Sequence, residues 1–199
     1  MSKKAHLHLR TDPVMAELIE KFGPIPLRPR RQPTFQSLTR AIVFQQLSGK
    51  AAETILGRFI GLFGDLPFPS PELVLSLTVE QLRAAGLSRP KAAYILGLAE
   101  HWLAGKLPSL EACKAMSDAE ILGAVTSIKG IGRWTAEMLL IFNLGRADVL
   151  PVHDLGVRRG FQLAYRKRSM PLPEQLEKFG LRWSPHRTTA ARYLWRAAG

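Results

Sequence analysis

The chain has 199 residues, 46% of them hydrophobic, enough for one substantial domain or for two lobes sharing a cleft. A single cysteine, Cys113, excludes an internal disulfide and a four-thiolate iron–sulfur or zinc site. Lysine and arginine number 28 against 16 aspartates and glutamates, a net charge of +12 that indicates a polyanionic partner, nucleic acid ahead of a membrane surface. A generally basic protein is the alternative.

Apolar residues recur at helical spacing along most of the chain, and the alternation typical of strands is nearly absent. In chain order, the first prediction is a pair of helices within 37–63 that breaks near Ser48-Gly49, followed by a short helix entered through the proline-rich segment 66–74. Further helices are predicted in 78–86, 88–105, 117–128, 133–143, 151–165, 173–179 and 186–197. Capping boxes mark two of these starts, Thr78 with Gln81 and Ser117 with Glu120.

The longest predicted loop is the basic, proline-punctuated segment 24–35. The fold class is therefore all-α, with about ten helices in two lobes with a cleft, all within a single domain 1–199. No apolar run approaches the length of about 18 residues needed to cross a bilayer, and the start, MSKKAHLHLRTD, lacks the hydrophobic centre of a signal peptide. We expect a protein of the cytoplasm, with the nucleoid in a bacterium, or of the nucleus in a eukaryote.

Two glycines bracket Ile131 in the segment Lys129-Gly130-Ile131-Gly132-Arg133, which joins two predicted helices. Glycine permits a positive φ and close approach of the backbone, and the isoleucine can fill the apolar seam between the helices. The amides and positive dipole end of the second helix then suit a phosphate oxygen, and Lys129 and Arg133 add positive charge. A plain helix–helix turn is the alternative, but it needs only one glycine.

The segments LGAVTSIKGIGRWTAEMLLIF and ADVLPVHDLGVRRGF resemble the helix–hairpin–helix signature of the DNA glycosylase superfamily, with the hairpin motif at about 117–143. In that superfamily a loop after the hairpin's second helix delivers an essential aspartate, and the resemblance assigns this role to Asp154. An ionised carboxylate can stabilise the positive charge that the sugar develops as a base departs, and it can orient or deprotonate the attacking water. A helix-capping role is the alternative for an aspartate near a helix start.

Members of the superfamily that also cut the DNA strand share a lysine two residues after the second glycine of the hairpin. This lysine attacks C1′ of the sugar and forms a Schiff base. Here that position is Trp134, which has no nucleophilic amine, and Lys129 lies on the other side of the hairpin. The resemblance therefore implies a monofunctional glycosylase without lyase activity.

Three more segments, RAIVFQQLSGKAA, LRAAGLSRPKAAYILGLA and RWSPHRTTAARYLWR, resemble the 3-methyladenine DNA glycosylase II branch, in a compact form without the amino-terminal sheet domain of some members. The resemblance covers roughly residues 20–197 and implies alkylated purines, 3-methyladenine and 7-methylguanine, as substrates. These bases carry positive charge, which aromatic faces attract after the nucleotide is flipped out of the duplex. The expected base-pocket residues are Trp134, Trp195, Met138, Phe22, Phe35 and Phe44, with core packing as the alternative for the tryptophans.

In this branch a side chain in the segment FQQLS wedges into the duplex, and the resemblance places this role at Gln46 or Leu47, with Gln46 favoured. A polar residue at a helix end is the alternative for Gln46. No metal site is predicted from side chains, because the five histidines are scattered. No cofactor is expected either, apart from the monovalent cation that the family's hairpin carbonyls can hold.

The sequence therefore predicts a DNA-3-methyladenine glycosylase II acting in base excision repair of alkylation damage. Its expected partner is damaged double-stranded DNA, with no membrane, and a monomer is expected. A glycosylase for another lesion, such as an etheno-adduct, a 1-alkyladenine or a deaminated base, remains an alternative. A non-catalytic DNA-binding module that uses the hairpin only to grip phosphates is another.

Overall fold

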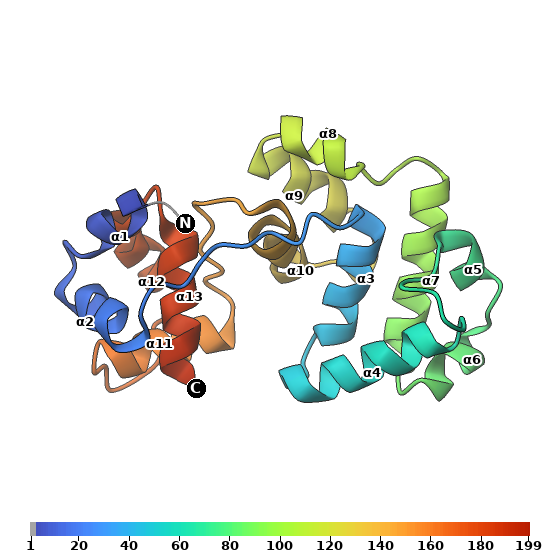
Figure 1. Ribbon diagram of the computed structural model, residues 1–199, viewed down its shortest axis with the longest axis horizontal. Helices are drawn as coiled ribbons and strands as arrows, with labels where there is room; N and C mark the ends of the chain where they lie inside the picture. Colours follow the sequence, from blue (N-terminus) through green and yellow to red (C-terminus); the bar gives the residue numbers. More distant parts are fainter. Residues whose placement is uncertain (1–2) are drawn as a thin grey trace. The chain divides into compact units, whose positions relative to one another are not determined.

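Residues 3–199, which the computed structural model describes, form thirteen α-helices, a π-helical turn and a 3₁₀ turn, with no β-strand among them (Figure 1). The predicted all-α class is confirmed, and the helices are more numerous than expected because α1, α2 and α8 were not predicted. The elements are α1 (Lys3–Leu9), α2 (Pro13–Phe22), α3 (Thr34–Phe44), α4 (Gly49–Gly61), α5 (Pro71–Leu75), α6 (Val79–Ala84), α7 (Arg89–Leu103), α8 (Leu110–Ala115), α9 (Asp118–Thr126), α10 (Arg133–Met138), η1 (Leu139–Leu144, π-helical), α11 (Leu155–Ala164), α12 (Pro173–Gly180), η2 (Leu181–Trp183, 3₁₀) and α13 (Arg187–Ala198).

Polar side chains define where eight of the helices begin. In each, the side-chain oxygen of the residue before the helix accepts a first-turn backbone N–H, which would otherwise lack a partner. These residues are Asp12, Ser48, Ser70, Thr78, Ser88, Ser109, Ser117 and Asp154. Both predicted capping boxes are present.

The predicted helices on either side of the segment 144–150 differ from the structure in their start or their form. The helix expected to open at Pro151 begins at Leu155, because Asp154 caps it and residues 151–154 form a turn in which the Asp154 N–H donates to the Pro151 carbonyl at 3.0 Å. The helix expected over 133–143 changes to π geometry at Leu139. No helix within residues 3–199 combines the length and apolar character that a membrane span requires.

The chain divides into two compact units, which agrees with the two predicted lobes. The first unit combines the segment up to Arg30 with Leu140–Gly199. Within it, α13 packs against α11 and α2 around a core that includes the buried Trp183 and Tyr193 (Figure 1). The α11–α13 contact is close enough that a Cβ on Gly160 would lie 1.8 Å from the Leu194 carbonyl oxygen.

The second unit comprises Arg31–Leu139. Its longest helix, α7, packs against α3, α5 and α6, while α3 also contacts α4 and α10, and α10 packs against α9 (Figure 1). This packing brings the loop after α3, the start of α7 and the α9–α10 connection around one pocket.

Candidate functional site

The α9–α10 connection is a tight, apolar-anchored hairpin. Ile128 and Ile131 are 2% and 3% exposed, and the Ile131 N–H donates to the Ile128 carbonyl at 3.0 Å. The burial of Ile131 therefore agrees with the prediction that this side chain fills the apolar seam between the two helices. Gly130 has a φ of +89°, which favours glycine, and a Cβ there would lie 2.2 Å from Cγ of Tyr94. The Tyr94 ring thus lies directly against the hairpin backbone.

The second hairpin glycine has a different role from the first. Gly132 has a φ of −86° and open space around its Cα, so its conformation does not require glycine. It stands before α10, where eight other helices carry a serine, threonine or aspartate that accepts an amide hydrogen. Because glycine has no side chain, the first-turn amides of α10 have no side-chain cap.

The two cations of the hairpin differ in their surroundings. Lys129 is exposed. Arg133 Nε donates to Glu137 Oε1 at 2.9 Å, and the Glu137 side chain is only 3% exposed. The Arg133 charge is therefore partly neutralised within the protein, although the Arg133 side chain is itself 58% exposed.

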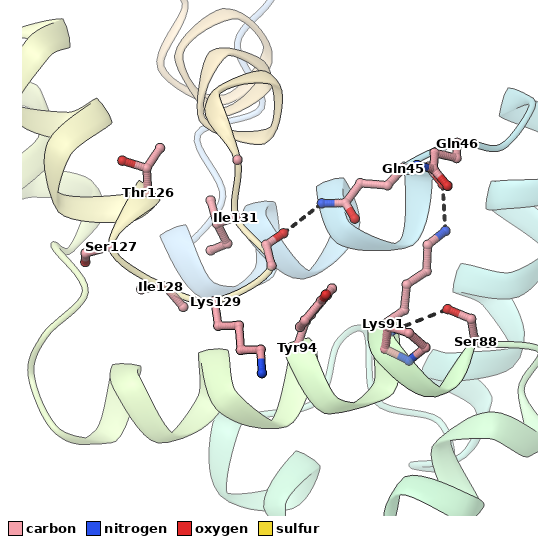
Figure 2. A pocket seen from close by; sticks show the side chains of 13 residues that line it. Gln45, Gln46, Ser88, Lys91, Tyr94, Thr126, Ser127, Ile128, Lys129 and Ile131 are labelled. Atoms are coloured by element: carbon pink, nitrogen blue, oxygen red, sulfur yellow. Dashed lines mark hydrogen bonds between the residues drawn. The ribbon is translucent and has the colours of Figure 1, made fainter.

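An open pocket of about 630 Å³ lies beside the hairpin in the second unit (Figure 2). Three elements line it, namely the segment Thr126–Gly132, the start of α7 from Ser88 to Tyr94, and the loop after α3 with Gln45 and Gln46. The structure thus brings the predicted hairpin and the predicted wedge loop to one pocket.

The predicted wedge residues are exposed at the tip of the loop after α3. Gln46 has a φ of +56°, which is uncommon for a residue with a side chain, and Leu47 is 40% exposed. Beneath them, Gln45 Nε2 donates to the Gly130 carbonyl at 3.0 Å and to Thr135 Oγ1 at 2.9 Å. Lys91 Nζ donates to the carbonyls of Val43 at 2.8 Å and Gln45 at 2.7 Å.

Gln45, Lys91 and Tyr94 were not predicted as site residues. Gln45 stands next to the predicted wedge, but helical spacing does not reveal which of two adjacent glutamines faces inward. Lys91 and Tyr94 lie more than 40 positions along the chain from this loop, in the quoted segment LRAAGLSRPKAAYILGLA, and only their folded contacts identify them.

In the first unit, Asp154 is both a capping residue and a member of a side-chain pair. Its Oδ1 accepts the Val157 N–H and the Trp195 Nε1–H, each at 2.8 Å. The indole reaches the carboxylate because residue 156 is glycine: a Cβ there would lie 2.9 Å from Trp195 Cδ1. The capping role that was the alternative for Asp154 is therefore present, and the same oxygen also accepts the indole N–H.

Trp195 also stacks on Phe142, with ring centroids 5.5 Å apart and an interplanar angle of 28°. The Phe142 carbonyl accepts the Arg30 N–H at 2.9 Å, and the Arg30 guanidinium lies 5.6 Å from the Phe142 ring. Phe142 was not predicted as a site residue. It belongs to η1, where the change from α to π geometry alters which residues share a helix face.

The loop that leads to Asp154 is fastened to the start of α13. Asp148 accepts from the Arg187 backbone N–H and side chain and from the Ser184 hydroxyl, at 2.8 to 3.1 Å. Burial alone would raise the pKa of Asp148, but the hydrogen bonds from Arg187 and Ser184 and the Arg187 charge together lower it. Thr188 Oγ1 accepts the Val149 N–H at 2.9 Å and donates to the Arg146 carbonyl at 2.7 Å. Helix α13 therefore holds both this loop and, through Trp195, Asp154 itself.

The predicted pocket aromatics fall into different environments. Phe35 is 3% exposed and packs against Phe68 and Trp102, so it is a core residue, because α3 directs it into the second unit. Phe22 packs against the core of the first unit, and Phe44 lies under the Arg40 guanidinium, 4.6 Å from the ring. Neither contact supports a pocket role. Met138 is buried in the second unit, while Trp134 in the second unit and Trp195 in the first unit are half-buried, so part of each residue is open to solvent.

Within residues 3–199, no three histidine, cysteine, aspartate or glutamate side chains lie together as a metal ion would require.

The described residues combine a helical fold, a glycine hairpin and an aspartate at a helix start, as expected for the superfamily of DNA repair proteins that the sequence resembles. Residues 39–186 match the family described as HhH-GPD superfamily base excision DNA repair protein, and the chain belongs to this superfamily.

Two curated relatives come from Schizosaccharomyces pombe. The chain is 36% identical to its DNA-3-methyladenine glycosylase 1 over 92% of this chain and 80% of that protein. It is 35% identical to an alkylbase DNA glycosidase-like protein over 97% of this chain and 92% of that protein. Among solved structures, the 3-methyladenine DNA glycosylase of the same species in complex with abasic DNA matches with a TM-score of 0.91 and 37% identity, covering 98% of this chain and 96% of that one.

Proposed function

We propose that the protein is a monofunctional DNA glycosylase that hydrolyses the N-glycosidic bond of alkylated purines, such as 3-methyladenine and 7-methylguanine, flipped out of duplex DNA. The observation that carries this proposal is Asp154, a carboxylate at the start of α11 whose Oδ1 is held by the Trp195 indole at 2.8 Å. The substrate class is supported by relatives named DNA-3-methyladenine glycosylase and by a structural relative in complex with abasic DNA.

Asp154 suits the chemistry of a cationic leaving group. An alkylated purine departs readily because it already carries positive charge, so the protein has mainly to stabilise the oxocarbenium-like sugar. A carboxylate fixed by a backbone amide and an indole N–H is oriented before the substrate arrives, so little of its stabilising effect is lost to reorganisation. The same carboxylate can orient the attacking water or accept its proton. The exposed parts of Trp134 and Trp195 are the surfaces proposed to stack on the extruded base.

The hairpin is proposed to bind a phosphate of the DNA backbone. Support comes from the uncapped start of α10, from exposed Lys129 and from the absence of a side chain at Gly132.

Gln46, exposed at the loop tip, is the proposed wedge. A monovalent cation at the hairpin carbonyls is compatible with this backbone, since a carbonyl such as Gly130 that accepts one hydrogen bond keeps a second lone pair. The protein is proposed to act as a monomer.

The test is release of free 7-methylguanine from a methylated duplex by the wild-type protein and by Asp154→Asn. We expect release by wild type and a loss of at least about a hundredfold in the variant, because a neutral amide cannot stabilise the sugar cation. Binding to a duplex that contains an abasic analogue should be retained, since the variant keeps the shape of the side chain.

The same samples, treated with borohydride, test the absence of lyase chemistry. No covalent protein–DNA adduct should form, because Trp134 lacks the amine that a Schiff base requires. Equal base release by both proteins would refute the role of Asp154. Binding without release of any lesion from a panel would favour the non-catalytic alternative.

A further inference from the structure

The loop that presents the proposed wedge is held from inside by two side chains. It follows α3, whose last carbonyls carry the negative end of the helix dipole. The Lys91 ammonium lies at this end and donates to the Gln45 carbonyl at 2.7 Å (Figure 2) and to the Val43 carbonyl at 2.8 Å. Burial lowers the pKa of Lys91, because the ammonium gives up part of its hydration in this position.

The second side chain, Gln45, links the loop to the hairpin. Its amide nitrogen donates to the Gly130 carbonyl in the hairpin, 85 positions along the chain (Figure 2), and to Thr135 Oγ1 in α10, 90 positions along the chain. A backbone carbonyl can only accept a hydrogen bond, so the amide nitrogen, and not the amide oxygen, must face Gly130. Both of its N–H groups are engaged, and Thr135 is buried.

These contacts bear directly on Gln46. A non-glycine residue at a φ of +56° is strained and keeps this conformation only where its neighbours impose it. Gln45 is immobilised on one side of Gln46, by its side chain on the hairpin and by its carbonyl on Lys91. The strained conformation that exposes Gln46 is therefore maintained by residues that do not themselves reach the loop tip.

We propose that Gln45 and Lys91 are positioning residues that join the wedge loop and the hairpin into one rigid body, so that gripping a phosphate at the hairpin sets how deeply Gln46 enters the duplex. The proposal rests on the proposed function, since it concerns how the same site opens DNA. It predicts that the two side chains act on base extrusion and not on phosphate binding, because neither lies at the solvent-exposed tip of the hairpin.

The experiment reads wedge entry without requiring catalysis. The DNA is a duplex with a tetrahydrofuran abasic analogue in one strand. The opposite strand carries 2-aminopurine next to the unpaired base, and the fluorescence of 2-aminopurine rises when the wedge unstacks it. Gln45→Leu and Lys91→Met should reduce this rise at saturation by at least about threefold, while the dissociation constant changes less than about threefold. Lys91→Arg should restore most of the signal, because it keeps the charge and the donors. Lys114→Met, which removes a charge from α8 in the same unit, should match wild type.

A double-mutant cycle separates positioning from general destabilisation. If Gln45 acts through the wedge, Gln45→Leu should cause no further loss in a Gln46→Gly background. Equal and additive losses in both backgrounds, or a full fluorescence rise in Gln45→Leu and Lys91→Met, would overturn the proposal. Melting temperatures within a few degrees of wild type establish that the variants are folded. No base is released in this fluorescence assay, so it is independent of catalysis. If the proposed glycosylase activity were wrong, the base-release assay would show no excision while the fluorescence response stayed the same.

Discussion

At the scale of single residues, one oxygen of Asp154 carries two hydrogen bonds with different consequences. The bond from Val157 starts α11, and the bond from Trp195 ties the carboxylate to α13. A helix cap is normally a local device, but here the second donor comes from 41 positions away. The carboxylate is thereby fixed in direction as well as in place, which an electrostatic catalyst requires.

Trp195→Phe separates the indole donor from the aromatic surface. Phenylalanine keeps a ring against Phe142 but removes the N–H, and a hydrogen bond to a charged group contributes about 1.5–3 kcal/mol. We expect the single-turnover rate of base release to fall about tenfold or more, and the melting temperature to fall by several degrees, because the same hydrogen bond also stabilises the fold. Unchanged release would mean that Trp195 serves only as a stacking surface.

Asp148 should make stability depend on pH through a lowered pKa. A carboxyl whose pKa is lower in the folded than in the unfolded protein stabilises the fold above its ordinary pKa of 3.8, and this contribution disappears as the pH falls through the folded-state value. Asp148→Asn should lower the free energy of unfolding by about 2 kcal/mol at pH 7. In urea titrations from pH 7 to pH 3, the gap to wild type should narrow below about pH 4. A gap independent of pH would contradict this assignment.

At the scale of elements, α11 and α13 form the frame that holds the proposed catalytic residues. Their backbones approach so closely at Gly160 that no other residue fits: a Cβ would meet the Leu194 carbonyl oxygen at 1.8 Å and its carbonyl carbon at 2.5 Å. Backbone atoms cannot move aside as the tip of a flexible side chain can. The separation of the two helices is therefore determined by the lack of a side chain at one position.

Gly160→Ala should force these helices apart and destabilise the protein by about 3 kcal/mol, at the upper end of the range for an overpacked core. Gly123→Ala is its matched control, since Gly123 also lies within a helix but a Cβ there would meet no atom within 4 Å. The control should be neutral or stabilise by up to about 1 kcal/mol through higher helix propensity. Chemical denaturation of both variants checks the contrast, and similar effects of the two changes would argue against the close contact.

At the scale of the whole molecule, the net charge of +12 acts beyond any one contact. Each phosphate contact releases condensed counterions, so the logarithm of the DNA association constant should fall linearly with the logarithm of salt concentration, with a slope of about −0.9 per phosphate contacted. Lys129→Met should make this slope shallower by about 0.9, and Lys114→Met should leave it unchanged. Fluorescence anisotropy across a salt series measures both slopes, and identical slopes for wild type and Lys129→Met would exclude a phosphate contact at Lys129.

Local chemistry made much of the fold predictable. The capping boxes at Thr78 and Ser117, the start of α7 at Ser88 and the glycine hairpin depend on residues only a few positions apart, and all are present in the structure. Asp154 was identified through the resemblance to the helix–hairpin–helix superfamily, and its capping bond follows from the local rule for residues at helix starts. Phe35 shows the limit of this approach, because an aromatic side chain on a helix has the same spacing whether it faces a core or a pocket.

By itself, the sequence determined the helical class, the hairpin, the aspartate, the charge and the lack of a lysine at Trp134, because each is a property of a short segment or of composition. Only the tertiary structure decided that the segment before Arg30 joins the C-terminal part in one unit, that Trp195 donates to Asp154, and that Gln45 and Lys91 hold the loop of Gln46. The physical reason is distance along the chain. Hydrogen bonds between groups 41 to 85 positions apart depend on how the helices pack, and this packing is a collective result of both cores.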